Sequence, residues 1–254
     1  MAPRKSIASD AVLLIDASYL LFYRYHATKR WLSFQENEEM QTKSALIDAF
    51  RKHLDDQMKK YAKTYKDIYM CCDCSRDDIW RHDYIEGYKG ERKSAPEDFE
   101  FLSSIYREVY RKYAKAEFKH GRLEADDIAY QVVKKLRAMG RRVVVVTGDR
   151  DYLQMADGDN VCIMQANGKA LGSTGDAHAD LLTKILIGDK SDNISPVKKR
   201  LGKATVAKLV EGGIEALDAW LEKEGCRASF EKNKLIIDLS QVPEKYLEGL
   251  EINV

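Results

Sequence analysis

The sequence predicts an α/β protein with a central, mostly parallel β-sheet flanked by helices. Three short apolar runs, at 11–15, 68–72 and 142–146, have the length and continuity of strands buried on both faces. Longer segments with helical spacing of apolar residues separate them. An aspartate follows each run closely, and the carboxyl ends of parallel strands are where such sheets bind ligands. The same pattern therefore predicts a fold and a place for a site.

Composition sets the class of protein. The 254 residues can bury a full core in one compact body, and 44% hydrophobic with 33% charged residues is typical of a soluble globular protein. No apolar run approaches the roughly 20 residues that span a bilayer, and no apolar signal segment follows the N-terminus. Five cysteines, three of them within 71–74, fit a reducing compartment. We therefore expect an intracellular protein with no membrane partner. The net charge of +1 argues neither for nor against nucleic acid.

The first two strands each end at an acid. Asp16 closes the run at 11–15, and an aspartate there is equally typical of a helix N-cap, so both interpretations stay open. Arg24 follows among tyrosines, where it could grip a phosphate or stack on a base. The helical spacing over 42–63 indicates a packing helix, and Asp73 follows the second run.

The segment 75–95 has almost no aliphatic residues and cannot build a core. It interleaves basic and aromatic residues, which suits phosphate and base contacts, although a solvated surface excursion is the alternative. We favour contacts to nucleic acid. A helix is predicted to begin near Pro96 and to run to about residue 113. The candidate contact residues are Arg81, Tyr88, Lys89 and Arg92.

Three acids gather at the predicted start of a helix, at Glu124, Asp126 and Asp127. Free N–H groups at a helix start favour one or two carboxylates, but a third needs another explanation. At about 100° per residue, Asp126 points away from the other two. Clustered oxygen ligands of this kind suit hard divalent cations.

The third strand is followed by Asp149 and Asp151 in a Thr-Gly-Asp-x-Asp turn, and an edge strand is predicted over 161–165 with a turn at 167–168. A helix over 179–187 is closed by Gly188, and Asp189 and Asp192 follow. A basic turn then enters a helix within 197–210, which indicates a phosphate grip or, alternatively, a solvated helix face. Its cations are Lys198, Lys199, Arg200 and Lys203.

So many carboxylates at one sheet edge would repel one another unless cations neutralised them. The pattern predicts two metal ions that promote in-line displacement at phosphorus. The predicted ligands are Asp16, Asp73, Glu124, Asp126, Asp127, Asp149, Asp151, Asp189 and Asp192.

The order and spacing of these acids over about 12–210 resemble the 5′-nuclease superfamily, which includes flap endonucleases, the 5′-exonuclease domain of bacterial DNA polymerase I and phage 5′-nucleases. The resemblance implies a PIN-like body over 1–188 with a helical arch at about 75–115. It also implies a helix-three-turn-helix DNA-binding element in 189–254 and two Mg²⁺ or Mn²⁺ ions. Residues 88–92 are similar to the Tyr-Lys-Gly-x-Arg pattern of the family's arch, where Tyr88, Lys89 and Arg92 would act on the scissile phosphate. Asp16, Asp73, Glu124 and Asp126 would hold the first ion, and the acids from Asp149 to Asp192 the second, with Asp127 serving either.

The implied activity is hydrolysis of DNA with a 5′ flap or junction, or of an RNA-DNA hybrid, by a monomer in replication or repair. The glycine-rich run of the family's helix-three-turn-helix is mostly replaced by basic residues here, which leaves K⁺ binding open. No sliding-clamp motif is recognisable, and the length resembles the phage or viral branch. The alternatives are a non-catalytic DNA-binding protein of the same fold and a small-molecule phosphatase.

Overall fold

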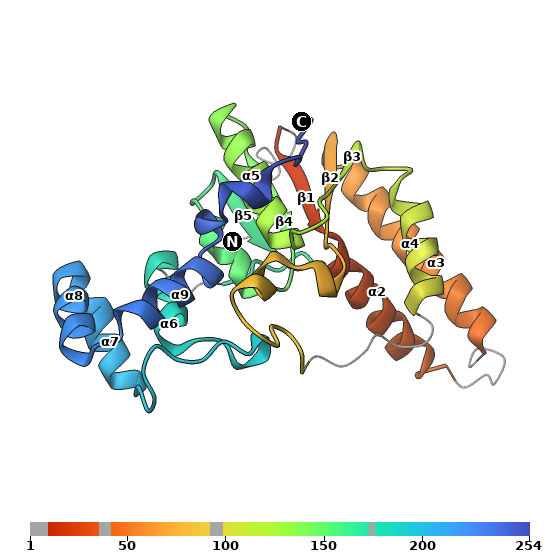
Figure 1. Ribbon diagram of the computed structural model, residues 1–254. Helices are drawn as coiled ribbons and strands as arrows, with labels where there is room; N and C mark the ends of the chain where they lie inside the picture. The colour runs from red at the N-terminus through yellow and green to blue at the C-terminus, as the bar shows by residue number, and fades with distance from the viewer. Residues whose placement is uncertain (1–9, 36–41, 92–98, 173–175) are drawn as a thin grey trace.

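A single parallel sheet lies at the centre of the computed structural model, which describes residues 10–35, 42–91, 99–172 and 176–254 (Figure 1). Its strand order is β3-β2-β1-β4-β5, and every neighbouring pair is parallel. The predicted parallel α/β fold is therefore confirmed. The strands are β1 (Val12–Asp16), β2 (Asp67–Cys72), β3 (Ala116–Lys119), β4 (Val143–Val146) and β5 (Val161–Met164).

The sequence missed β3. Its four residues, Ala-Glu-Phe-Lys, contain neither a continuous apolar run nor a full alternation, because it is an edge strand with only Phe118 fully buried. The edge position of β5 was predicted correctly.

Helices cover both faces of the sheet because side chains alternate along each strand. Leu13 and Ile15 of β1 pack with α2 (Ala17–Leu32), α3 (Lys43–Ala62) and α4 (Phe99–Tyr110). Val12 and Leu14 point to the other face, towards α5 (Ala125–Ala138). None of the described helices is long and apolar enough to cross a membrane.

The C-terminal third is helical, with α6 ending where Gly188 adopts φ 76°. Helices α7 and α8 lie at the end of the molecule away from α3 and α4 (Figure 1), and α9 leads back to the body, where Ile236 O accepts a hydrogen bond from Arg81 Nε. The bounds are α6 (Ala177–Ile187), α7 (Lys203–Glu211), α8 (Gly213–Glu224), α9 (Arg227–Ile237) and α10 (Glu244–Leu247).

The segment predicted as an arch begins with two 3₁₀ helices, Arg76–Asp78 and Trp80–Asp83. Residues 92–98 lie outside the described residues. The helical arch therefore stays a prediction.

Candidate metal centre

The carboxyl ends of neighbouring strands bring Asp16 and Asp73 together. Asp16 accepts hydrogen bonds from Tyr19 N at 3.0 Å and from Thr147 Oγ1 at 2.9 Å, the threonine lying just past β4. Asp16 is therefore the N-cap of α2 and also lines the acidic pocket, while its role as a metal ligand stays a prediction. Burial, and then the charge of Asp73, raise the pKa of Asp16 to about 7.

Asp73 ties β2 to the start of α5. Its Oδ1 accepts a hydrogen bond from Ala125 N at 2.8 Å, and its Oδ2 accepts one from Ser18 Oγ. Glu124, the N-cap residue of α5, is thereby fixed beside the strand ends.

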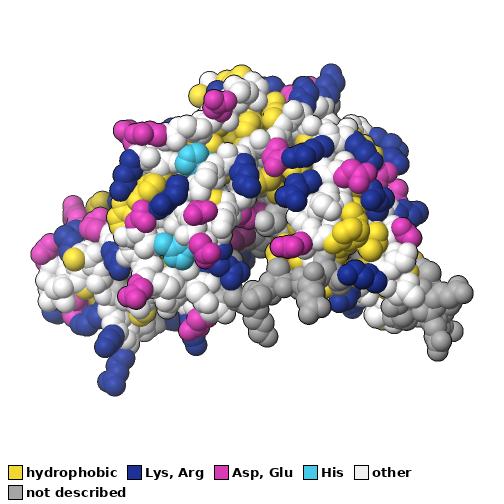
Figure 2. All heavy atoms as spheres, turned by 45° about the vertical axis from the view of Figure 1, so that its right-hand side comes forward, with side chains coloured by type: hydrophobic (Ala, Val, Ile, Leu, Met, Phe, Trp, Pro, Cys, Tyr) yellow, Lys and Arg dark blue, Asp and Glu magenta, His cyan; other side chains and the backbone are white. Residues whose placement is uncertain are grey.

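The three acids of α5 divide only partly as the helical spacing predicted: Glu124 and Asp127 share Arg81, but Asp126, predicted to point away from both, lines a pocket together with Glu124. Asp126 lines a pocket of about 310 Å³ together with Asp16, Asp73, Glu124 and Asp149. Burial and the nearby Asp127 raise the pKa of Asp126 well above its usual range. Figure 2 shows acidic side chains inside a hollow near the centre of the face in view. A carboxylate that is costly to ionise alone is one that a divalent cation would stabilise.

Asp127 instead faces the interior and is fully buried. Its oxygens accept hydrogen bonds from Arg81 Nη1 and Nη2, both at 2.7 Å, and from Trp80 Nε1 at 3.0 Å. One oxygen each of Glu124, Asp126 and Asp127 lie within 4.8 Å of one another, close enough to share an ion. A role of Asp127 as a metal ligand therefore stays a prediction. The described contacts show it anchoring Arg81.

Arg81 does not lie where the sequence placed it. It was predicted to contact DNA, but it is 2% exposed and also donates to Glu124 Oε2 at 2.9 Å. Its charge is neutralised inside the protein, so it is not a DNA-facing residue in this structure. A segment with few aliphatic residues gives no sign that one of its arginines is internal. The prediction that this segment cannot build a core was wrong, because Ile79 and Ile85 are buried in the core with Trp80.

Tyr88 and Lys89 both contact Glu124. Tyr88 is 3% exposed and donates to Glu124 Oε2 at 3.0 Å, while Lys89 Nζ pairs with Glu124 Oε1 and lies 3.9 Å from Asp192 Oδ2. Lys89 has φ 54°, and its N–H donates to Asp192 O at 3.3 Å, so its backbone is held on the second acidic turn. The predicted partner Arg92 lies outside the described residues.

A second acidic group lies beside the first. One oxygen each of Asp151, Asp189 and Asp192 lie within 4.8 Å of one another. Asp149 caps the 3₁₀ helix Arg150–Met155 by accepting from Asp151 N at 2.9 Å. Because Asp149 lines both the acidic pocket and a neighbouring pocket with Asp151 and Asp189, it connects the two groups.

Lys184 is a site residue that the sequence reasoning missed. Its Nζ lies 2.9 Å from Asp189 Oδ2 and bonds both oxygens of Asp151. Burial disfavours its charge, but Asp151 and Asp189 together raise the pKa of Lys184. Burial likewise opposes ionisation of Asp189, but hydrogen bonds from Ser191 and Lys184 lower its pKa to about 2. The only signal was a lysine one turn before Gly188, on the helix that enters the acidic turn.

The donors fit hard divalent cations, because both groups offer carboxylate oxygens as ligands. Lys89 contacts Glu124 of the first group and Asp192 of the second, and Lys184 contacts Asp151 and Asp189 of the second.

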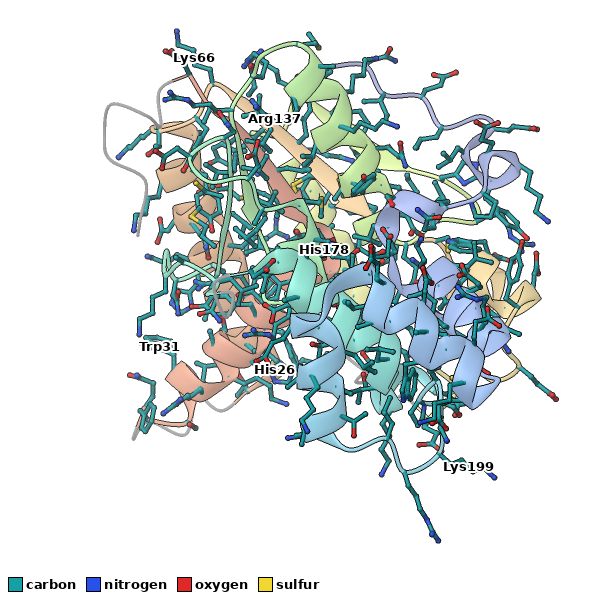
Figure 3. All side chains as sticks on the ribbon, turned by 90° about the vertical axis from the view of Figure 1, so that its left-hand side faces the viewer. His26, Trp31, Lys66, Arg137, His178 and Lys199 are labelled. Carbon is teal, nitrogen blue, oxygen red and sulfur yellow. The ribbon has the colours of Figure 1, made fainter. Side chains whose placement is uncertain are left out.

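The remaining predicted contacts lie away from the acids. Lys198 pairs with Glu224, while Lys199, Arg200 and Lys203 are exposed around the start of α7. Figure 3 shows Lys199 on the outside of the molecule, across the view from Trp31 on α2. Arg24 is half-buried on α2, with its guanidinium 4.6 Å from the Tyr23 ring centroid.

A family model for the N-terminal, resolvase-like domain of 5′-3′ exonucleases matches residues 11–181. The chain belongs to this family. The matched range contains Asp16 and Asp73 at the ends of β1 and β2. It also contains the three acids at the start of α5 and the turn with Asp149 and Asp151.

Relatives of known name include DNA polymerase I of Thermus aquaticus, 29% identical over 248 residues, which cover 91% of this chain and 28% of that protein. Ribonuclease H of Enterobacteria phage T4 is 32% identical over 155 residues, covering 56% of this chain and 50% of that protein. The chain thus spans about 28% of the polymerase relatives that it matches.

Solved structures share the fold. A bacteriophage T5 flap endonuclease in complex with DNA and metal ions has a TM-score of 0.65 at 16% identity, covering 94% of this chain and 96% of that chain. The zinc-bound 5′-exonuclease of T5 gives 0.63, also at 16% identity, with 90% and 89% covered.

Proposed function

We propose that this protein is a structure-specific 5′-nuclease that hydrolyses phosphodiesters of branched or 5′-ended DNA with two divalent ions, Mg²⁺ or Mn²⁺. The observation that carries the proposal is the pair of adjoining acidic groups at the carboxyl edge of the sheet, whose carboxylates pair with Lys89 and Lys184. Family membership supports the activity. The bound ions would supply a water of lowered pKa and stabilise the leaving oxygen.

The acids of the site are proposed to fall into two sets of metal ligands and one supporting residue. Asp16, Asp73, Glu124 and Asp126 are proposed to hold one ion, and Asp151, Asp189 and Asp192 the other, with Asp149 facing both. The buried Arg81–Asp127 pair holds the start of α5 in place. Asp127 therefore supports the site through Arg81 and Glu124.

Lys89 is proposed to face the scissile phosphate, with Arg92 beside it. Lys89 Nζ lines the acidic pocket and bonds Glu124. With ions bound at that acid, the ammonium would stabilise charge that develops on the phosphate.

Basic residues around α7 are proposed to hold duplex DNA. Lys199, Arg200 and Lys203 are exposed, and the T5 endonuclease of the same fold was solved with DNA. The T4 relative named ribonuclease H supports an RNA-DNA hybrid, such as a primer, as a further substrate.

The decisive assay uses a 5′-labelled flap duplex with Mg²⁺ and compares the wild type with Asp149→Ala. We expect the wild type to release the labelled fragment and Asp149→Ala to lose about 10²-fold or more of the rate. Asp159→Ala, which changes an exposed aspartate before β5, is the matched control and should cleave like the wild type. A wild type that binds the flap without cutting it would make the chain a DNA-binding protein. Cleavage of p-nitrophenyl phosphate alone would make it a phosphatase.

A further inference from the structure

A separate pocket of about 500 Å³ lies between α2, α3 and the turn after β5. Tyr23 and Arg24 line it from α2, Gln57, Lys60 and Tyr61 from α3, and residues 166–168 from the turn. Its volume is within the range of small-ligand sites. None of the acids predicted to bind metal lines it.

Two buried polar atoms at this pocket have no hydrogen-bond partner in the described structure, Gln57 Oε1 and Arg24 Nε. The Gln57 amide nitrogen is fixed by Ala166 O at 2.8 Å and Tyr61 OH at 2.6 Å, and the residue is 9% exposed. Its oxygen is therefore a positioned acceptor. Buried polar groups are normally satisfied, so the pocket favours a ligand with a donor for Gln57 and an acceptor for Arg24.

The other walls define the class of ligand. Arg24 and Lys60 supply positive charge, and the acid that lines the pocket, Asp56, pairs with Lys52 at 2.8 Å. The rings of Tyr23, Tyr61 and Tyr65 provide aromatic surface. These groups match a nucleotide: the cations suit its phosphate, the aromatic rings suit the face of its base, and the Gln57 amide oxygen suits an amino group of the base.

Tyr19 connects this pocket to the acidic pocket, although no described residue lines both. Tyr19 lines the acidic pocket, and its hydroxyl accepts a hydrogen bond from Ala166 N at 3.1 Å. The Tyr19 ring centroid is 5.9 Å from that of Tyr23, one turn further along α2. The two pockets are therefore neighbours along α2, as two contact sites on one DNA strand would be.

We propose that this pocket is a nucleotide subsite that takes one unpaired nucleotide of the DNA strand, with its phosphate against Arg24 and Lys60 and its base against the tyrosines. The inference rests on the proposed nuclease function, since it assigns the nucleotide to the strand being cut. A free 5′-mononucleotide has the same chemistry, and the test separates these two sources.

The test measures binding of dAMP by calorimetry in EDTA, which prevents cleavage, for the wild type, Arg24→Met and Lys60→Met. Neither side chain donates a hydrogen bond among the described residues, so neither change should harm folding. We expect each to weaken dAMP binding about fivefold or more, the scale of a lost contact to a charged group. Lys63→Met removes the same charge at an exposed position outside the pocket, and should change binding less than about twofold.

Competition decides the source of the nucleotide. An unlabelled single-stranded oligonucleotide should displace dAMP from the wild type. Equal dAMP affinity in the wild type and Arg24→Met, or no binding at all, would overturn the subsite while Mg²⁺-dependent flap cleavage still supported the nuclease. Binding of dAMP that DNA does not displace would also overturn it. Failure of the nuclease itself is recognised separately, as absence of cleavage in Mg²⁺.

Discussion

Arg81 and Asp127 form a buried two-bonded ion pair, with Nη1 to Oδ2 and Nη2 to Oδ1 both at 2.7 Å. The pair joins the 3₁₀ helix Trp80–Asp83 to the first turn of α5, and Arg81 Nε binds Ile236 O at the end of α9. One arginine therefore joins three segments that are distant in the sequence, and it also bonds Glu124, which lines the acidic pocket.

Removing this arginine should destabilise the fold. Arg81→Met leaves Asp127 buried without its charge partner, and breaking a buried pair in this way costs about 3–5 kcal/mol. We expect a lower urea midpoint at equilibrium. The exposed pair of Arg51 with Glu108, with bonds of 2.7 and 2.8 Å, is the matched control, and Arg51→Met should change the midpoint little. Equal midpoints for both variants would contradict the anchoring role.

The stability of the metal-free protein should depend on pH through Asp16. Burial and Asp73 raise its folded-state pKa from 3.8 to about 7. Between about pH 4 and pH 7 the folded state binds more protons than the unfolded chain, so the stability that Asp16 contributes falls as pH rises. We expect Tm in EDTA to decrease across this window and Mg²⁺ to restore it at pH 7.

The control for this dependence is a pair of isosteric changes. Asp16→Asn removes the titrating group and should flatten the decrease of Tm, whereas Asp10→Asn, at an exposed position, should leave it as in the wild type. A slope that is unchanged in Asp16→Asn would assign the dependence to another acid.

Lys184 should compete with a divalent ion for Asp151 and Asp189. In Lys184→Met the two acids lose their ammonium partner, so the metal-free protein should be less stable. Mg²⁺ should then raise the Tm of the variant more than that of the wild type, because binding to the folded state adds stability. Lys190→Met changes an exposed lysine in the turn between Asp189 and Asp192 and should behave like the wild type. Equal Mg²⁺ shifts in all three proteins would show that Lys184 does not share the ion's ligands.

Lys89→Ala should slow flap cleavage far more than it weakens DNA binding. The ammonium lies inside the acidic pocket and would act on charge that develops at the phosphate, which is worth about 10²-fold or more in rate. Single-turnover rates and dissociation constants in EDTA measure the two effects separately. Lys119→Ala alters a lysine at the end of β3 that lies outside this pocket, so it serves as the control. Equal losses of rate and affinity in Lys89→Ala would assign it to binding alone.

The sequence predicted most of the sheet and the site, because both depend on local signals. Continuous apolar runs indicated β1, β2 and β4, and acids after them met at one edge through parallel pairing. It could not predict partners across the fold. Arg81 and Lys199 are both cations in basic segments of the sequence. Arg81 is nevertheless buried and paired with Asp127, whereas Lys199 is exposed. Lys184 was missed because its role depends on acids from two other segments.

The basic turn before α7 should determine how strongly salt weakens DNA binding. Each lysine that neutralises a phosphate contributes about 0.9 to the slope of log K against log salt concentration, because it releases counterions. Lys199→Met should therefore lower the slope by about 1 and weaken binding to all duplex sequences alike. Lys198 pairs with Glu224, so Lys198→Met should lower the slope less than Lys199→Met. Lys134→Met, at an exposed position on α5, should leave the slope unchanged. Fluorescence anisotropy with a labelled duplex at several salt concentrations measures these slopes, and an unchanged slope in Lys199→Met would place the duplex elsewhere on the protein.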